Sequence, residues 1–195
     1  IGVRIHYDYL VIALGSETNF FGLKNVEKHS FTMKTLADAI SLRNRLIDML
    51  EQAENEKNPK IKERLLTFVI VGGGFAGVET AGEINDFLHD AVSYYHNTKK
   101  EDIHVILVEA ASTILQGFNK RLTEYAHNKL EKNGIKIMLE NAVTSFDGKN
   151  VILNKLSKQS VGIDSKNIIN SHTLVWTAGV TPVEIIQNSI FKIKK

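Results

Sequence analysis

The stretch that decides the fold reads Leu65-Leu66-Thr67-Phe68-Val69-Ile70-Val71-Gly72-Gly73-Gly74-Phe75-Ala76-Gly77-Val78-Glu79-Thr80-Ala81-Gly82-Glu83. It opens with an apolar, β-branched run, which is typical of a strand buried on both faces of a parallel sheet. It then passes through Gly72-x-Gly74-x-x-Gly77 into a sequence that favours a helix. Glycine-rich turns are common, but a turn of this spacing between a strand and a helix predicts dinucleotide binding.

The three spaced glycines have separate roles in such a turn. Gly72 permits the tight turn out of the strand, Gly74 lets a pyrophosphate approach the backbone, and Gly77 lets the helix pack close to the strand. The free N–H groups of the first helical turn, together with the helix dipole, then face the phosphates. We therefore expect the cofactor to be bound by the whole turn, which comprises Gly72, Gly73, Gly74, Phe75, Ala76 and Gly77.

Composition limits the class of protein. The 195 residues carry a net charge of +2, with 43% hydrophobic and 24% charged residues, which is ordinary for a globular domain. No basic cluster is interleaved with aromatics, so we expect no nucleic-acid partner. There is no cysteine, the seven histidines show no metal-ligand spacing, and no apolar run reaches the roughly 18 residues of a membrane span. The chain does not begin with Met, and we expect it to be part of a longer protein.

The remaining pattern predicts an α/β fold: a Rossmann-like, three-layer dinucleotide-binding domain with a parallel sheet and a β-meander crossover. Strands are expected at residues 3–6, 9–14, 65–71, 103–108, 135–139, 142–146, 150–154, 168–170 and 173–179. Helices are expected from a cap at Thr32 or Thr35 to about residue 56, at 77–96, and at 119–133 before a C-terminal cap at Gly134. Residues 16–30 are expected to form an irregular connector, and the last residues no full element.

Two features of the first long helix are also predicted. Its apolar spacing indicates one buried stripe, formed by Met33, Leu36, Ala37, Ile40, Ile47 and Leu50 and interrupted at Arg43 and Asn44. Pro59, within residues 55–60, is expected to end the helix.

Two carboxylates are candidates for the site. Glu109 follows the strand at 103–108, where a Rossmann fold places its ribose ligand, although it lies 32 positions after Gly77 and about 20 is usual. The alternative is a surface carboxylate at a strand end. Glu79 follows Gly77 by two residues, and it either interacts with the helix dipole or faces the nicotinamide end of the cofactor. Glu83 lies on the same helix face.

Four segments in order carry a family resemblance: residues 7–16, 72–79, 106–110 and 175–180. Together they resemble the two-dinucleotide-binding-domain flavoproteins of the pyridine nucleotide-disulfide oxidoreductase superfamily. Within that group they are most similar to type II NADH dehydrogenase, a single-subunit NADH:quinone oxidoreductase. The resemblance implies a division into residues 1–30, a remnant of a split FAD domain plus linker; 31–182, the NADH-binding domain; and 183–195, the start of the return to the FAD domain.

The resemblance also implies roles for residues. Ala110 accompanies Glu109 at the NADH site, and Gly15, Ala178 and Gly179 lie where strands return toward FAD. Glu79 is implied as the catalytic carboxylate near nicotinamide and flavin. Leu14 stands where the family usually has threonine.

The implied activity is hydride transfer from NADH to FAD, followed by electron transfer to quinone, with NAD and FAD as cofactors. Quinone and the membrane surface would be contacted by other parts of the longer parent protein. This parent is expected to be cytoplasmic and bound peripherally to the cytoplasmic face of the membrane, and it could form a homodimer. We expect this segment alone not to catalyse. The alternatives are another NAD(P)H-dependent flavin reductase, of the disulfide, ferredoxin or sulfide:quinone type, or a non-catalytic nucleotide-binding module.

Overall fold

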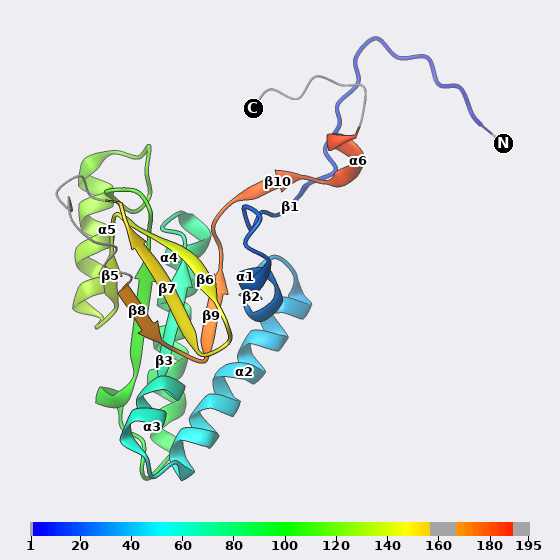
Figure 1. Ribbon diagram of the computed structural model, residues 1–195. Helices are drawn as coiled ribbons and strands as arrows, with labels where there is room; N and C mark the ends of the chain where they lie inside the picture. The colour runs from blue at the N-terminus through cyan, green and yellow to red at the C-terminus, as the bar shows by residue number, and fades with distance from the viewer. Residues whose placement is uncertain (1, 157–166, 189–195) are drawn as a thin grey trace.

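The protein is a three-layer α/β domain in the computed structural model, which describes residues 2–156 and 167–188. A parallel sheet with the order β2-β9-β3-β4-β5 lies between a layer of helices and an antiparallel meander, β6-β7-β8 (Figure 1). The sheet strands are β2 (Phe31–Thr32), β3 (Thr67–Val71), β4 (His104–Val108), β5 (Lys136–Met138) and β9 (Thr173–Trp176). The meander strands are β6 (Asn141–Phe146), β7 (Asn150–Lys155) and β8 (Asn167–Asn170). The predicted fold class is confirmed. All of these strands except β2, which was not predicted, were expected to within three residues at either end.

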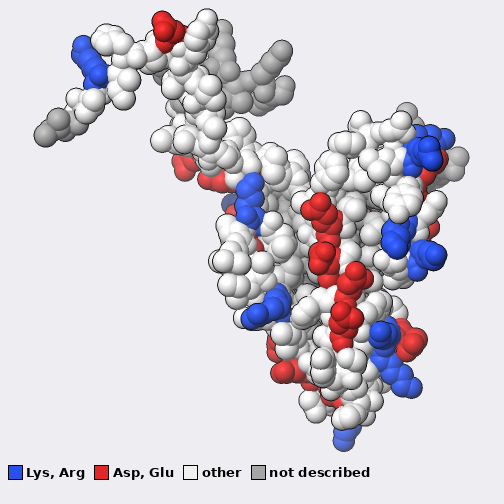
Figure 2. All heavy atoms as spheres, turned by 180° about the vertical axis from the view of Figure 1, so that it is seen from behind, with Lys and Arg blue, Asp and Glu red and all other residues white. Residues whose placement is uncertain are grey.

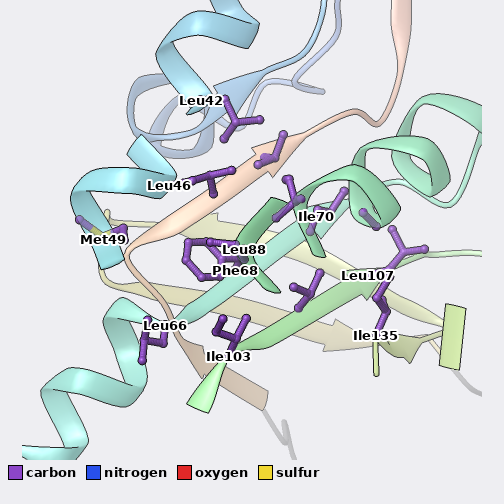
Figure 3. Packing of buried hydrophobic residues seen from close by; sticks show 14 of the residues in the cluster. Leu42, Leu46, Met49, Leu66, Phe68, Ile70, Leu88, Ile103, Leu107 and Ile135 are labelled. Carbon is purple, nitrogen blue, oxygen red and sulfur yellow. The ribbon is translucent and has the colours of Figure 1, made fainter. Parts of the chain in front are cut away.

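The central strand β3 is buried on both faces. Phe68 and Ile70 belong to the core between the sheet and the helices, whereas Val69 and Val71 belong to the core between the sheet and the meander. Figure 3 shows the first of these cores, in which Phe68 and Ile70 lie among leucines of the helix layer and β4. Because each face needs apolar side chains, the strand reads as an unbroken apolar run.

Four helices form the layer on one face: α2 (Leu36–Asn55), α3 (Pro59–Leu65), α4 (Phe75–Ala91) and α5 (Lys120–Lys132). Thr35 begins α2 with a capping box, because its side chain accepts the Asp38 N–H and the Asp38 carboxylate accepts the Thr35 N–H. Gly134, with φ +90°, follows α5 as predicted. Pro59 does not simply end α2, because it also starts α3 in the first turn after the Asn58 cap.

The predicted stripe of α2 is wrong for most of its members. The buried residues are Leu42, Leu46, Met49, Leu50 and Ala53, whereas Leu36 is 77% exposed and Met33 and Ile40 are also exposed. The buried residues of α2 begin at Leu42, so the side chains before this position are not covered by the core. The apolar spacing at the start of the helix therefore does not correspond to a buried face.

The meander carries the second core. Asp147 forms its first turn, with Oδ1 accepting the Lys149 N–H at 2.9 Å and the Asn150 N–H at 2.7 Å. Helix α1 (Lys24–His29) packs on this layer, and Val26 is fully buried with Phe146. The expectation that residues 16–30 are irregular is thus wrong. Two short 3-10 turns, η1 (Val92–Tyr94) and η2 (Lys100–Asp102), complete the connection from α4 to β4.

The segment before the domain differs most from expectation. Residues 2–15 are all exposed and contain no strand, so the strands predicted at 3–6 and 9–14 are wrong. A strand needs a neighbour for its backbone hydrogen bonds, and no described segment pairs with these residues. Instead β1 (Ser16–Thr18) pairs antiparallel with β10 (Val180–Pro182), and this ribbon leads away from the domain (Figure 1). Helix α6 (Glu184–Gln187) follows it, where no element was expected; residues 189–195 lie outside the described part.

Arg45 joins α2 to the start of β9. Its Nη2 donates to the His172 carbonyl at 2.6 Å, and its Nε donates to Thr173 Oγ1 at 3.3 Å. Burial lowers the pKa of the Arg45 guanidinium, and the Asp48 carboxylate offsets part of this effect. We expect Arg45→Met to lower the free energy of unfolding by about 1–3 kcal/mol in urea denaturation, because it leaves buried acceptors without their donor.

Arg43 provides the control on the same helix. Its side chain is exposed and donates only to the neighbouring Asn44 among the described residues. Arg43→Met should change the free energy of unfolding by no more than about 0.5 kcal/mol. Equal effects of the two substitutions would show that the contacts of Arg45 with β9 contribute no specific stability.

Candidate dinucleotide-binding site

The glycine turn connects β3 to α4 with three residues. Gly72 has φ +111°, a backbone conformation that favours glycine. A Cβ at this position would lie 2.9 Å from the Ala178 nitrogen and 3.0 Å from Thr177 Oγ1. Gly72 therefore permits both the turn itself and close packing of the residues that follow β9.

Gly77 and Gly74 have opposite surroundings. A Cβ on Gly77 would lie 1.7 Å from the Gly72 carbonyl oxygen, so no side chain fits between α4 and the turn. A Cβ on Gly74 would meet nothing within 4 Å. Gly74 is also the N-cap of α4 and supplies no side-chain cap to the N–H groups of the first turn. An open approach to uncapped N–H groups at a helix N-terminus fits a pyrophosphate.

Glu109 lies directly after β4, beside the glycine turn. Its Oε2 accepts the Gly73 N–H, and its Oε1 accepts the Ala111 N–H at 2.7 Å. These bonds fix the carboxylate and leave each oxygen a further lone pair for a hydroxyl group. The long spacing after Gly77 is taken up by α4 and by the turns η1 and η2.

Two cavities flank Glu109, which lines both. The first, of about 230 Å³, is lined by Gly73, Gly74, Phe75, Glu109, Thr113, Leu115, Gln116 and Phe118. The second, of about 260 Å³, is lined by Phe21, Leu23, Val71, Gly72, Val108, Glu109, Ala110, Asn141, Ala142, Val143, Trp176 and Ala178. Neither lining contains a lysine, arginine or histidine. Together the cavities follow the carboxyl edge of the sheet, which is where Rossmann folds bind dinucleotides.

An aromatic pair borders the first cavity. The rings of Phe75 and Phe118 meet edge to face with centroids 4.8 Å apart, and both are about half exposed. Phe75 is the first residue of α4, and Phe118 precedes the Asn119 cap of α5. The pair brings the start of α4 together with the segment after Glu109, a contact that the sequence did not indicate.

Glu79 lies on the helix side of the turn. Because α4 begins at Phe75 rather than at the expected Gly77, Glu79 is in the second turn of the helix. The helix dipole acts mainly within the first turn, so it explains this carboxylate less well than the sequence suggested. Glu79 lines a groove of about 400 Å³ between α2 and α4, together with Ala76, Glu83 and Arg43.

Acidic side chains form a row along α4. Glu79, Glu83, Asp86 and Asp90 are exposed and follow one another at intervals of four, three and four residues. Figure 2 shows this face from behind, with a row of carboxylates down its middle. Within the described residues, none of the four forms an ion pair with a lysine or arginine. Glu79 and Glu83 line the groove with one cationic side chain, Arg43, so its net negative charge disfavours a phosphate.

The residues after β9 reach the glycine turn. Ala178 packs against Gly72, and Gly179 has φ +75° beneath the ring of Phe21, whose Cζ would lie 2.6 Å from a Cβ on Gly179. The Asn19 N–H donates to the Gly179 carbonyl at 3.2 Å. Gly15 is not brought to this place, because it precedes Ser16, at the end of the β1–β10 ribbon opposite Gly179. Of the predicted site residues, Gly15 alone is thus separated from the turn.

Two residues that hold the turn in place were not predicted from the sequence. Thr177 Oγ1 donates to the Val71 carbonyl at 2.8 Å, and the Leu115 N–H donates to the Gly73 carbonyl at 2.7 Å. A polar residue between an apolar strand and a glycine was a signal for Thr177. Leu115 offered none, because it acts through its backbone.

Residues 2–156 and 167–188 contain no group of three or more His, Cys, Asp or Glu side chains arranged to hold a metal ion. Over the same residues, no helix combines the length and the apolar character that crossing a membrane would require.

The fold and the turn define a class of protein. A parallel sheet whose central strand ends in this glycine turn, with a carboxylate after the neighbouring strand, is a Rossmann-like dinucleotide-binding domain. The family model described as pyridine nucleotide-disulphide oxidoreductase matches residues 2–194, and the chain belongs to this family.

Individual relatives narrow the resemblance. The chain is 35% identical over 192 residues to the mitochondrial external alternative NADH-ubiquinone oxidoreductase of Yarrowia lipolytica, covering 97% of this chain and 32% of that protein. It is 34% identical over 176 residues to the type II NADH:quinone oxidoreductase Ndh of Mycobacterium tuberculosis, covering 90% and 37%. The structure of NDH2 from Plasmodium falciparum in complex with NADH matches with a TM-score of 0.82 and 25% identity, over 95% and 37% of the two chains. The predicted resemblance to type II NADH dehydrogenases is confirmed, and the chain spans about a third of the length of these relatives.

Proposed function

We propose that this chain is the NADH-binding domain of a flavoprotein NADH dehydrogenase that passes hydride from NADH to FAD and electrons onward to a quinone. The observation that carries the proposal is the turn at Gly72–Gly74–Gly77, open at Gly74, with Glu109 on one side and Ala178 on the other. The names of the relatives support the same activity.

The chain's residues have distinct tasks in this proposal. The first-turn N–H groups of α4 bind the pyrophosphate, and the Glu109 carboxylate accepts hydrogen bonds from a ribose. Glu79 places a negative charge beside the nicotinamide, where positive charge develops as hydride leaves. When bound, FAD supplies the hydride acceptor. Over the described residues only one glycine-rich turn opens a helix, so the flavin would be held chiefly by other parts of the longer protein.

The same proposal covers the organisation of the chain. Residues 1–30 carry a remnant of the FAD domain and a linker, 31–182 form the NADH domain, and 183–195 begin the return. The β1–β10 ribbon supports this division, because it pairs the segment that enters the NADH domain with the segment that leaves it. The exposed apolar side chains of residues 3–14 suit a strand of the missing domain. Quinone and the membrane surface would be contacted by other parts of the longer protein.

The test is anaerobic mixing of NADH with the flavin-loaded protein that contains this chain. We expect NADH to bleach the flavin absorbance and added quinone to restore it. A flavin that stays oxidised with NADH would overturn the proposal. Reduction by NADH without reoxidation by quinone would instead favour another flavin reductase, of the disulfide or ferredoxin type.

Glu79→Gln removes the charge and keeps the shape of the side chain. We expect it to slow flavin reduction by NADH by about 10- to 100-fold in stopped-flow measurements, because transition-state charge loses a preorganised partner. The melting temperature should shift by no more than about 2 °C, since Glu79 is exposed and makes no ion pair with a described residue.

Glu83→Gln is the matched control, because Glu83 lines the same groove one turn further along α4. It should leave the rate of flavin reduction within about twofold of the unsubstituted protein. If Glu79→Gln reduces the flavin as fast as Glu83→Gln, the carboxylate at position 79 has no special relation to the nicotinamide.

A further inference from the structure

Thr177 occupies the point where β9 leaves the sheet beside the glycine turn. The Val71 carbonyl accepts two hydrogen bonds from this residue, one from its N–H at 2.9 Å and one from Oγ1 at 2.8 Å. The hydroxyl also lies 3.4 Å from the Gly72 carbonyl oxygen. Its oxygen would be 2.8 Å from a Cβ on Gly77, so both glycines border it closely. The hydroxyl thus sits in a space made by two missing side chains.

The other side of the turn is held without Thr177. The Gly72 N–H donates to the Val108 carbonyl at 2.9 Å, and the Gly73 N–H donates to the Glu109 carboxylate. The Leu115 N–H donates to the Gly73 carbonyl. These bonds connect the turn to β4 and the segment after it, which is the side of the ribose and the pyrophosphate.

On the side of Ala178 and Gly179, Thr177 makes the bond to the end of β3, while the Asn19 N–H donates to the Gly179 carbonyl further along. Ala178 packs on Gly72, and its position is set by the residue before it in the chain. A methyl group in place of the hydroxyl could not lie 2.8 Å from the Val71 oxygen. A methyl carbon forms no hydrogen bond with a carbonyl oxygen, so the two atoms stay at the longer van der Waals distance. A substitution at Thr177 would therefore displace Ala178 and Gly179 more than the rest of the turn.

We propose that Thr177 is a positioning residue of the dinucleotide site, whose hydroxyl fixes the Ala178–Gly179 segment against the glycine turn and so sets the nicotinamide half of NADH in register with the phosphate half. The inference rests on the proposed function and deepens it. Thr177 need not touch the cofactor; it acts through the backbone of the two residues that follow it.

Two probes separate the halves of the site in the flavin-loaded protein that contains this chain. ADP-ribose carries the adenosine, the pyrophosphate and a ribose but no nicotinamide. Tetrahydro-NADH carries the whole dinucleotide and cannot donate hydride. Calorimetric titration gives the affinity for each, and the long-wavelength charge-transfer absorbance of the flavin reports whether the nicotinamide stacks on it.

In Thr177→Val we expect the affinity for ADP-ribose to stay within about twofold of the unsubstituted protein. The affinity for tetrahydro-NADH should be about tenfold lower, because the hydrogen bond that positions the Ala178–Gly179 segment is lost. The charge-transfer absorbance should weaken in parallel. Thr177→Ser keeps the hydroxyl and should restore both. Thr177→Ala, which removes the hydroxyl without adding a methyl near Val71, should show the same selective loss if the valine variant fails to fold.

Thr173→Val is the matched control on the same strand. Its hydroxyl meets Arg45 at the opposite end of β9, and it should leave both affinities unchanged. Equal weakening of both probes by Thr177→Val, or no change in either, would overturn the role of Thr177 while leaving the proposed function in place. Failure of the unsubstituted protein to bind either probe would overturn both.

Discussion

Gly77→Ala should destabilise the glycine turn and, with it, the domain built around the turn. The added Cβ would lie 1.7 Å from the Gly72 carbonyl oxygen, a backbone atom of a residue that Thr177 and Ala178 already border closely. Overpacking of this kind costs about 3 kcal/mol or more, against a gain of roughly 1 kcal/mol in helix propensity. The expected result in a thermal scan is a melting temperature lower by about 4 °C or more.

Gly74→Ala is the matched substitution three residues earlier in the same motif. Its Cβ would meet nothing within 4 Å, and Gly74 has φ −74°, which alanine adopts readily. The melting temperature should therefore change by less than about 2 °C. NADH affinity should nevertheless fall by at least about tenfold, because the methyl group occupies the approach of the pyrophosphate.

Gly77→Ala and Gly74→Ala together distinguish the effect of the glycine motif on stability from its effect on NADH binding. If Gly74→Ala destabilises the fold as much as Gly77→Ala, the open side of the turn is not open in solution. If Gly74→Ala binds NADH normally, the pyrophosphate does not pass over this residue and the orientation of the dinucleotide is different.

The core of the sheet could be predicted from the sequence because burial on both faces leaves a local mark. The run from Thr67 to Val71 has apolar side chains for two cores, and glycines or turn residues delimit each strand. The same pattern misled at residues 9–14, which are equally apolar but exposed. An apolar run indicates that a segment is covered by other apolar residues, and those residues need not belong to the same domain.

Helix α2 shows the corresponding limit for helices. Its existence followed from the sequence, and its cap was narrowed to Thr32 or Thr35, because both depend on neighbouring residues; the structure has Thr35. Its buried face did not follow from the sequence, because apolar residues occur on more than one face and only the part of the helix from Leu42 onward is buried. Which face is buried depends on where β3 and β9 lie, and that is set by the rest of the fold.

The site divides in the same way. The glycine spacing and Glu109 were predictable, since a turn conformation and a strand end are local features. Thr177 and Leu115 were not, because their partners Val71 and Gly73 lie 106 and 42 positions away in the chain. The residues that shape the turn from outside thus become visible only once the strands are placed side by side.

The domain should prefer NADH to NADPH by about 10- to 100-fold in affinity, and Glu109 should be the reason. Its carboxylate is fixed by the Gly73 and Ala111 N–H groups, so it cannot turn away from a ribose phosphate. The two cavities beside it contain no cationic side chain to receive that phosphate. Charge-assisted hydrogen bonds to ribose hydroxyls contribute about 1.5–3 kcal/mol, and repulsion of the phosphate adds to the difference.

Glu109→Ala should bring the two affinities to within a few-fold of each other, mainly by weakening NADH, and it should also lower stability because the Gly73 N–H loses its acceptor. Glu140→Gln is the control, since it removes an exposed carboxylate near the same sheet edge, where its N–H donates to the Ala111 carbonyl. It should leave the NADH preference intact, because a screened charge acts weakly at a distance. Calorimetric titration of both nucleotides decides the matter: equal affinities in the unsubstituted protein, or a preference that survives Glu109→Ala, would place the adenosine ribose away from Glu109.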